Sequence, residues 1–243
     1  MKIAFVADIH GNLPALEAVE RDIASCAPSE VYCLGDVVGY GAEPWECLQR
    51  IRERGWGMLL GNHEAAIIEP AYADAFNPFA RAALLYSMGA IGKEGRAWLR
   101  TLPQVIETES LQLCHGWSHG SRRFQYVLSE QDVGNIFSES TRPTVVMGHG
   151  HYHALFCRPA GQDGSTYSRD HVQTVPIGAR AVINVGSVGQ PRDNDPRACW
   201  ALYDDGSRTW EFRRVGYDAA EAARRIREAG LSQKLADRLL DGR

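Results

Sequence analysis

The chain has 243 residues, of which 44% are hydrophobic and 23% are charged, values that allow a large hydrophobic core and are ordinary for a globular protein. Acidic residues outnumber basic residues by 30 to 26, which gives a net charge of −4. This charge argues against a surface that binds nucleic acid or anionic membranes without specificity.

Cysteine usage and hydropathy predict the cellular compartment of the protein. None of the six cysteines lies in a C-x-x-C pair, so we expect buried free thiols in a reducing compartment rather than a disulfide framework. The apolar segment before Asp8 is too short for a signal-peptide core, and no segment reaches the roughly 18 apolar residues of a membrane span. We therefore expect a cytoplasmic protein without a membrane segment.

The first 64 residues repeat a pattern of strand, polar motif and helix. Short apolar runs predict strands at residues 2–7, 31–34 and 57–60. Helices are expected at 13–24, where Asn12 can cap the N-terminus and Pro14 lies in the first turn, and at 45–53. Strands that alternate with crossover helices form parallel sheets, so the pattern predicts an α/β fold.

The remainder of the chain changes from helical to strand-rich. Residues 65–102 are rich in alanine and are expected to be helical, interrupted at Pro78. Further strands are expected at 105–109, 111–116, 144–147, 154–158, 171–175, 181–185, 198–204 and 209–214. A helix at 129–139 and one or two amphipathic helices at 218–241 complete the pattern. Without repeats or linkers, the sequence predicts a single domain over residues 1–243, built on two sheets.

Five of the expected strands end in a polar motif. These motifs are Asp8-Ile9-His10, Gly35-Asp36, Gly61-Asn62-His63-Glu64, His115-Gly116 and Gly148-His149-Gly150-His151. The carboxyl ends of strands in an open α/β sheet face one crevice, where ligands bind. The motifs are therefore expected to meet at one site, with glycines that allow sharp turns and close approach to a ligand.

Seven side chains in these motifs are candidate metal ligands. Oxygen comes from Asp8, Asp36 and Asn62, and imidazole nitrogen comes from His10, His115, His149 and His151. Seven donors exceed the needs of one tetrahedral ion, but they suit two ions about 3.5–4 Å apart that share a carboxylate or a water. Two aspartates leave such a pair of divalent ions electropositive, so the site would attract phosphate. Nitrogen and oxygen ligands without thiolate favour Mn, Fe, Zn, Co or Ni over Mg or Ca.

In this order, the motifs resemble those of the calcineurin-like metallophosphoesterases over nearly the whole chain. Residues 8–17, 35–44 and 184–192 resemble one bacterial branch, which includes small phosphodiesterases and diadenosine-tetraphosphatase-like proteins. The resemblance implies a four-layer α/β/β/α sandwich of two mixed β-sheets, with the metals at one edge. There are two departures from the family pattern near the ligands: Gly150 stands where Thr or Ser is frequent, and Cys114 stands where Gly is frequent.

The resemblance also implies how the ligands divide between two divalent ions. One ion would be held by Asp8, His10, Asp36 and His151, and the other by Asp36, Asn62, His115 and His149. Asp36 would therefore bridge the ions. Mn²⁺ is the ion most expected to activate in vitro, with Fe, Zn, Co or Ni as alternatives.

The activity implied is hydrolysis of phosphodiester or nucleotide pyrophosphate bonds. A hydroxide that bridges the metals would attack phosphorus in line with the leaving oxygen. His63 would protonate the leaving group or donate a hydrogen bond to it. Glu64 would raise the pKa of His63 if its carboxylate reaches the ring, so His63 and Glu64 are the expected catalytic residues.

Contacts with a small phosphoester or nucleotide substrate are expected from five further residues, Tyr40, His119, Asn184, Ser187 and Arg192. Tyr40 would stack on the substrate or pack its own loop, and Arg192 would bind phosphate bidentately. His153 has no assigned role beyond the protein surface or the surroundings of the metal ligands. A nucleic-acid partner is not expected, and a homo-oligomer formed through an exposed edge strand is left open.

Two alternatives use the same fold. A catalytically silent metal-binding scaffold for protein interactions would keep the fold and lose the chemistry, but the sequence retains His63 and every ligand. A phosphoprotein phosphatase would carry an arginine shortly after Asp36, where this chain has Gly39-Tyr40-Gly41. A metal-dependent hydrolase of small phosphoesters is therefore the function that the sequence favours.

Overall fold

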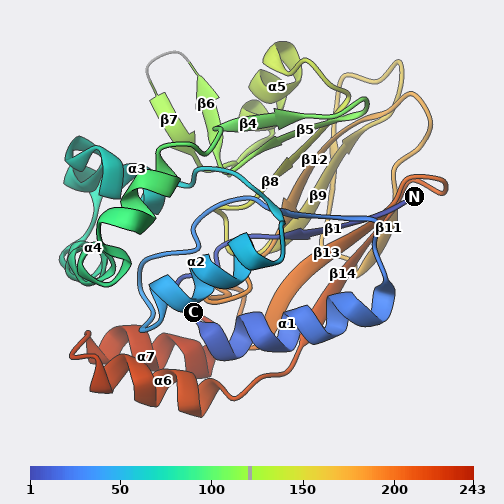
Figure 1. Ribbon diagram of the computed structural model, residues 1–243. Coiled ribbons are helices and arrows are strands. Elements are labelled where there is room, and N and C mark those ends of the chain that lie inside the picture. The colour runs from blue at the N-terminus through green and yellow to red at the C-terminus, as the bar shows by residue number, and fades with distance from the viewer. Residues whose placement is uncertain (120–121) are drawn as a thin grey trace.

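Two six-stranded sheets form the centre of the computed structural model, which describes residues 1–119 and 122–243 (Figure 1). The first sheet has the order β11 (Val172–Thr174), β14 (Thr209–Val215), β13 (Ala198–Asp204), β1 (Lys2–Val6), β2 (Glu30–Cys33) and β3 (Gly57–Met58). The second has the order β10 (Thr166–Ser168), β9 (His153–Arg158), β12 (Arg180–Val185), β8 (Thr144–Met147), β5 (Leu111–Cys114) and β4 (Val105–Glu107). Both sheets are mixed: β1 pairs in parallel with β2 and antiparallel to β13, and β8 pairs in parallel with β5 and β12, while β12 is antiparallel to β9.

Alternation along the strands explains why the two sheets stack. Ile3 and Phe5 of β1 share a buried cluster with Leu113 of β5 and Ile183 of β12, so they fill the space between the sheets. Val6 belongs to a different cluster on the outer face. Because side chains alternate between the two faces of a strand, the apolar residues of β1 contribute both to the core between the sheets and to the core beneath the outer helices.

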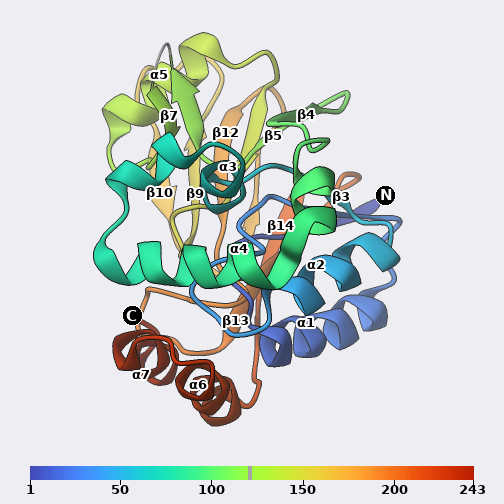
Figure 2. The same cartoon turned by 60° about the vertical axis from the view of Figure 1, so that its left-hand side comes forward.

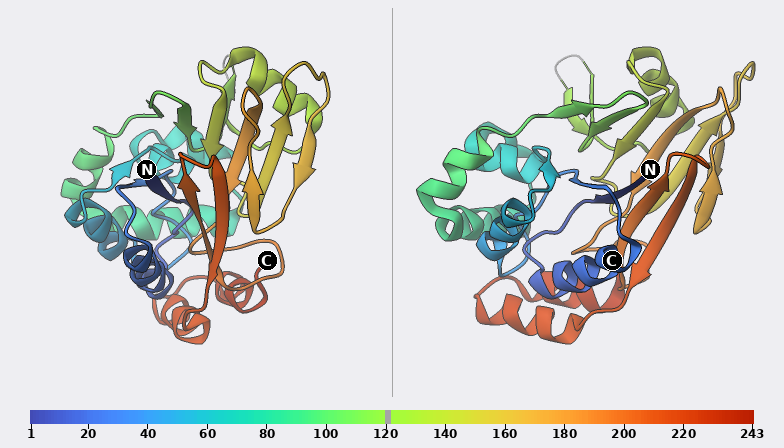
Figure 3. Two further views of the ribbon diagram at one scale, coloured as in Figure 1. Left: turned by 90° about the vertical axis from the view of Figure 1, so that its right-hand side faces the viewer. Right: turned by 45° about the vertical axis from the view of Figure 1, so that its right-hand side comes forward.

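Helices cover the outer faces of the sandwich. The helices before residue 100 are α1 (Leu13–Cys26), α2 (Pro44–Glu53), α3 (Asn62–Ile68), a 3₁₀ helix (Pro70–Ala75) and α4 (Pro78–Leu99). Those after it are α5 (Glu130–Glu139), α6 (Ala219–Glu228) and α7 (Gln233–Asp241). The outer-face cluster that contains Val6 also contains buried residues of α1, α2 and α4, so it joins these helices to the first sheet. Helix α5 packs on the second sheet through Val133, Ile136 and Phe137 (Figure 3). The predicted α/β/β/α sandwich is therefore confirmed.

The expected helical region after residue 65 is present, but some local features were not predicted. The region consists of α3, the 3₁₀ helix and α4, with the expected interruption at Pro78, and Gly92 inside α4 has a φ of 59°. The motif that starts at Asn62 begins α3. The hairpin of β6 (Trp117–His119) and β7 (Arg122–Gln125) and the edge strand β10 were not predicted, since strands of three or four residues carry little periodic signal.

Two further features bear on the predictions. The six cysteines are free thiols, and Cys114 is buried as expected. Within the described residues, no helix is both long and apolar enough to cross a bilayer. The chain ends with the pair α6 and α7, whose buried residues pack against Ala83 of α4.

Candidate metal centre

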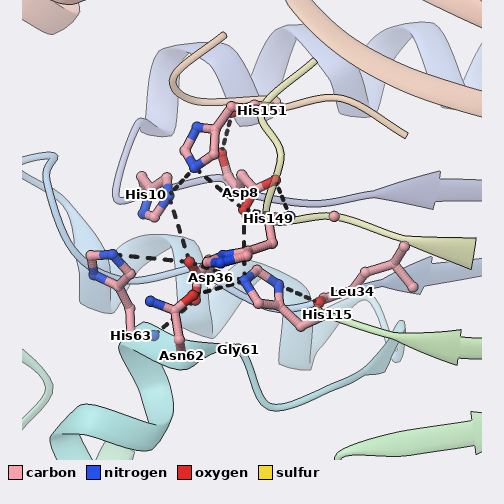
Figure 4. A network of polar contacts seen from close by, with 12 residues as sticks. Asp8, His10, Leu34, Asp36, Gly61, Asn62, His63, His115, His149 and His151 are labelled. Carbon is pink, nitrogen blue, oxygen red and sulfur yellow. Dashed lines mark hydrogen bonds and ion pairs between the residues drawn. The ribbon is translucent and has the colours of Figure 1, made fainter. Parts of the chain in front are cut away.

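The predicted ligands lie where the carboxyl ends of strands from both sheets meet (Figure 4). Asp8 and His10 follow β1, Asp36 follows β2, Asn62 begins α3, His115 follows β5, and His149 and His151 follow β8. Six of these side chains belong to residues no more than 7% exposed, and Asn62 is partly buried. The structure thus brings donors from four strands and one helix into a single buried cluster.

The donors form three overlapping groups, each with its ligand atoms within 4.8 Å of one another. The groups are Asp8 with His10 and His151, Asp36 with His115 and His149, and Asp36 with His10 and His63. The first two groups are contained in the two ligand sets expected from the sequence. The third shares His10 with the first group and Asp36 with the second, so Asp36 lies next to both.

Asp36 has one carboxylate oxygen that points into the cluster and one that is held by the backbone. Its Oδ1 accepts a hydrogen bond of 2.9 Å from the His63 N–H. Its Oδ2 lies 3.2 Å from His115 Nε2, 3.8 Å from His10 Nε2 and 4.0 Å from His63 Nε2. This oxygen and the imidazole nitrogens around it are therefore candidate ligands for a cation.

Backbone carbonyls fix the tautomers of three of the histidines. The Nδ1 atoms of His10, His115 and His151 donate to the carbonyls of Val38, Leu34 and Gln190 at 2.9, 2.8 and 2.7 Å. A neutral ring that carries its proton on Nδ1 has only a lone pair on Nε2. A hydrogen bond from Nδ1–H to a carbonyl oxygen, which leaves Nε2 for the metal, is a usual way in which a protein orients a metal-binding histidine.

Two of these lone pairs face each other, because the Nε2 atoms of His10 and His151 lie 3.3 Å apart. His115 differs, since its ring is protonated in the absence of metal and its Nε2 donates to Asn62 Oδ1 at 3.0 Å. Neutral acceptors do not hydrogen-bond one another, whereas a cation between them would satisfy both. The donor set therefore fits divalent metal ions on the evidence of its own geometry.

Burial keeps most of these rings neutral. It lowers the pKa of His149 to about 3 and the pKa of His10 and His151 well below the ordinary value. For His115, burial acts to lower the pKa, but the Asp36 carboxylate outweighs it and raises the pKa to about 9. Because ligands must be deprotonated to bind, a metal ion at Asp36 would replace the proton that His115 otherwise holds.

The backbone at the ligands is strained. Five predicted ligands have a positive φ, namely Asp8 (54°), His10 (50°), Asp36 (55°), His149 (66°) and His151 (59°). Non-glycine residues rarely adopt this conformation, and such strain concentrates at functional sites. The turns aim successive side chains into the cluster at the cost of local stability.

Glu64 has a different place from the one expected. Its carboxylate accepts hydrogen bonds of 2.8–3.1 Å from the N–H groups of Asp36, Val37, Val38 and Gly61. These bonds direct the carboxylate to the backbone, so the expected pairing with the His63 ring is not formed. Glu64 instead holds the loop that carries Asp36.

Asn184 and Ser187, which were expected to contact substrate, lie beneath the ligand loops. Asn184 Nδ2 donates to the Gly148 carbonyl at 3.1 Å, and Ser187 Oγ donates to the Asp8 carbonyl at 2.8 Å. A Cβ at Gly150 would overlap Nδ2 of Asn184. The amide thus fills the space that a larger residue would need at position 150, which accounts for glycine there.

A cavity of about 280 Å³ opens over the cluster, and Tyr40 and Arg192 line it as expected. The Arg192 guanidinium lies 5.7 Å from the centre of the Tyr40 ring and donates to Gln190 Oε1 at 2.9 Å. The rest of the wall includes residues that the sequence did not single out: Tyr72, Phe76, Asn77, Arg123, Phe124 and Tyr126. No motif marks these residues, since they come from the 3₁₀ helix, α4 and the region of β7.

Two other histidines were singled out in the sequence. The side chain of His119 lies outside the described part of the structure. His153 is buried, and its Nδ1 accepts a hydrogen bond of 3.1 Å from Arg214 beside the carboxylate of Asp193. His153 therefore belongs to a buried ionic cluster next to the metal centre.

Comparisons with known proteins agree with this geometry. A family model described as calcineurin-like phosphoesterase matches residues 1–183, which include all the predicted ligands. An uncharacterised protein from Methanocaldococcus jannaschii is 32% identical over 245 residues, which cover 99% of this chain and 98% of that protein.

Solved structures extend the likeness to the whole chain. A metallophosphoesterase from Sphaerobacter thermophilus superposes with a TM-score of 0.85 at 31% identity, covering 100% of this chain and 99% of the other. A hypothetical protein from Pyrococcus horikoshii OT3 shares the fold, with a TM-score of 0.82, 20% identity and coverage of 100% and 98%. Because the coverage is complete, the likeness includes the segment after residue 183.

Proposed function

The chain belongs to the calcineurin-like phosphoesterase family, and we propose that it is a dinuclear-metal phosphoesterase that hydrolyses phosphodiester or nucleotide pyrophosphate bonds. The main support for the proposal is that the Nε2 lone pairs of His10 and His151 face each other. In addition, Asp36 belongs to two of the three groups of candidate ligands. Cations would satisfy the acceptors of this buried arrangement.

The ligands would divide into two sets. Asp8, His10, Asp36 and His151 would hold one ion, and Asp36, Asn62, His115 and His149 would hold the other. When bound, two divalent ions supply Lewis-acid polarisation of a phosphoryl group and lower the pKa of water toward neutrality. Nitrogen and oxygen donors without thiolate suit Mn, Fe, Zn, Co or Ni, and among these we propose Mn²⁺ for activity in vitro because the family resemblance implies it.

Arg192 would hold the negative charge of the substrate. It lines the cavity over the cluster, and the Gln190 side chain and the Tyr40 ring fix the orientation of its guanidinium. A guanidinium held in place loses little entropy when it binds a phosphate bidentately. Arg192 would therefore orient the phosphoryl group over Asp36.

His63 would act at the leaving oxygen. The residue lines the cavity, its Nε2 lies 4.0 Å from Asp36 Oδ2, and its Nδ1 is buried beside Gly39 without a hydrogen-bond partner in the described structure. Nε2 is thus the atom that would present a proton to substrate. Glu64 would support this step indirectly, because its bonds to Asp36 and Gly61 fix the loops on either side of His63.

The proposed function is tested by a Mn²⁺-supplemented panel of bis-p-nitrophenyl phosphate, p-nitrophenyl phosphate, diadenosine tetraphosphate and cyclic nucleotides. We expect diester or pyrophosphate hydrolysis to exceed monoester hydrolysis. A preference for the monoester would contradict the substrate class. Lack of activity on every compound, at full metal content, would instead support the silent scaffold.

A further inference from the structure

A second cavity lies next to the metal centre, between α4 and α7. It has a volume of about 360 Å³ and is lined by Tyr40, Asn77, Phe79, Lys234, Leu235 and Arg238. In Figure 2 the N-terminal end of α4 lies over α7, and buried residues of the two helices share one hydrophobic cluster. Tyr40 and Asn77 also line the cavity over the metal ligands, so the two cavities share a wall.

Tyr40 is the partition between the cavities. Its ring centre lies 4.5 Å from that of His10 and 4.7 Å from that of His63. A group that passes this ring therefore leaves the metal centre and enters the second cavity directly. Arg192 lies over the same ring, at the boundary.

Three basic side chains line the two cavities and form no ion pair with an acidic residue in the described part of the chain. Arg192 lines the first cavity and Lys234 and Arg238 line the second, and no ion pair joins any of the three to a carboxylate within the described residues. The acids nearby are engaged elsewhere, since Asp237 pairs with Arg227. Burial, and then the charge of Arg192, lower the pKa of Arg238, as expected for like charges that lack a counterion.

We propose that the second cavity binds a distal phosphate of the substrate, so that the preferred substrates carry a chain of two or more phosphates. The inference rests on the proposed function, because the scissile phosphate is taken to lie at the metal centre. A polyphosphate chain would run from the metal ligands past Arg192 to Lys234 and Arg238. Lys234 Nζ lies 4.8 Å from the centre of the Phe79 ring, which places its charge at the wall of the second cavity.

The test compares inorganic phosphate with tripolyphosphate as inhibitors of bis-p-nitrophenyl phosphate hydrolysis. The ratio of the two inhibition constants is the readout, and we expect tripolyphosphate to bind at least about tenfold more tightly. In the double variant Lys234→Gln/Arg238→Gln, this preference should fall by about tenfold. Chelation of Mn²⁺ by tripolyphosphate is the same for every protein, so it cancels when the ratio in the variant is compared with the ratio in the unmodified protein. A free Mn²⁺ concentration held constant in all assays keeps it from affecting the ratio within one protein.

A matched control removes two cations elsewhere on the surface. Lys93 and Arg100 are exposed near the other end of α4, so Lys93→Gln/Arg100→Gln should keep the preference. The variant Lys234→Arg/Arg238→Lys retains both charges and should keep most of it, which separates lost charge from lost packing. An unchanged ratio in the first double variant, or equal binding of the two anions by the unmodified protein, would overturn the subsite.

Failure of the subsite and failure of the proposed function have different signatures. Absence of hydrolysis by the unmodified protein contradicts the function. Calorimetric titration of the Mn²⁺-loaded protein with the same two anions then still decides the subsite, since it measures binding directly. The same ratio of dissociation constants in the unmodified protein and in Lys234→Gln/Arg238→Gln would reject it.

Discussion

The Nε2 atoms of His10 and His151 lie 3.3 Å apart, although the Nδ1 atom of each ring donates to a backbone carbonyl. Both Nε2 atoms are therefore acceptors, and their lone pairs repel one another until a cation lies between them. The protein holds this pair in place through strained turns, since φ is 50° at His10 and 59° at His151. Folding thus holds together two acceptors that a metal ion would satisfy.

The first consequence is that metal should stabilise the protein. An ion at about 100 times its dissociation constant contributes about 2.7 kcal/mol per site, and 1 kcal/mol shifts the Tm of a chain of this length by about 2–4 °C. We expect Mn²⁺ to raise the Tm of chelator-treated protein by about 5 °C or more, measured by differential scanning fluorimetry. His151→Ala should lose at least half of the gain. Identical Tm values with and without Mn²⁺ would rule out a cation-dependent cluster.

His63→Ala should lower kcat by about 10²- to 10⁴-fold, the usual range for the loss of an acid–base group. The metal content should stay near that of the unmodified protein, because the predicted ligand sets do not include His63. Mass spectrometry of bound metal and initial rates measure both quantities. His171→Ala is the matched control, since its ring bonds to the Phe212 carbonyl instead. Equal rates for the two variants would remove His63 from the reaction.

Asp193 should make the free energy of unfolding decrease as the pH falls into the acidic range. Although burial acts to raise it, hydrogen bonds involving His153 and Arg214 hold the pKa of Asp193 below its usual value. A carboxyl with a lowered pKa in the folded state contributes stability that is complete above its unfolded pKa of about 4 and is lost as pH falls through the folded pKa.

Asp193→Asn tests this contribution. At pH 7 the variant should lose about 3 kcal/mol of unfolding free energy, because buried Arg214 then keeps only the more distant carboxylate of Asp195, at 3.8 Å. The difference from the unmodified protein should begin to shrink below about pH 4, where the unfolded carboxyl takes up its proton, and should continue to shrink as pH falls through the lower pKa of the folded state. Urea unfolding at several pH values measures it. A constant difference from pH 7 to pH 3 would contradict the ion pair.

Gly150→Thr should destabilise the protein by about 1–3 kcal/mol, the usual cost of overpacking. The added Cβ would overlap the Asn184 amide, which is tied to the Gly148 carbonyl. Asn184→Ala should make room, so the double variant should lose less stability than the two single losses added together. A double-mutant cycle from urea unfolding measures this coupling. Additive losses would show that the two positions do not compete for space.

The cluster of candidate ligands could be located from the sequence because most of its members lie just after a strand. Asp8, Asp36, His115 and His149 need only the rule that strand ends meet at one edge, together with the chemistry of their side chains. The α/β/β/α layers follow from the same reasoning, since apolar alternation in β1 supplies both cores. Local pattern is sufficient where the strand itself positions the residue.

Other parts of the site depend on packing between distant segments. Glu64 was expected beside His63, but helix α3 turns its carboxylate to the backbone of residues 36–38. The cavity wall at Tyr72 and Phe124 is formed by the 3₁₀ helix and β7, whose ring contact at 5.9 Å joins positions 52 residues apart in sequence. No short-range periodicity encodes such contacts, so they emerge only from the folded chain.

The central claim is that two ions share the Asp36 carboxylate. Titration of metal-free protein with Mn²⁺, followed by calorimetry and by mass spectrometry of bound metal, measures it most directly. We expect two ions per chain for the unmodified protein and weakened binding of both in Asp36→Ala. Asp193→Asn, which removes a carboxylate outside the centre, should retain two. One ion per chain, or two ions held as tightly by Asp36→Ala, would contradict it.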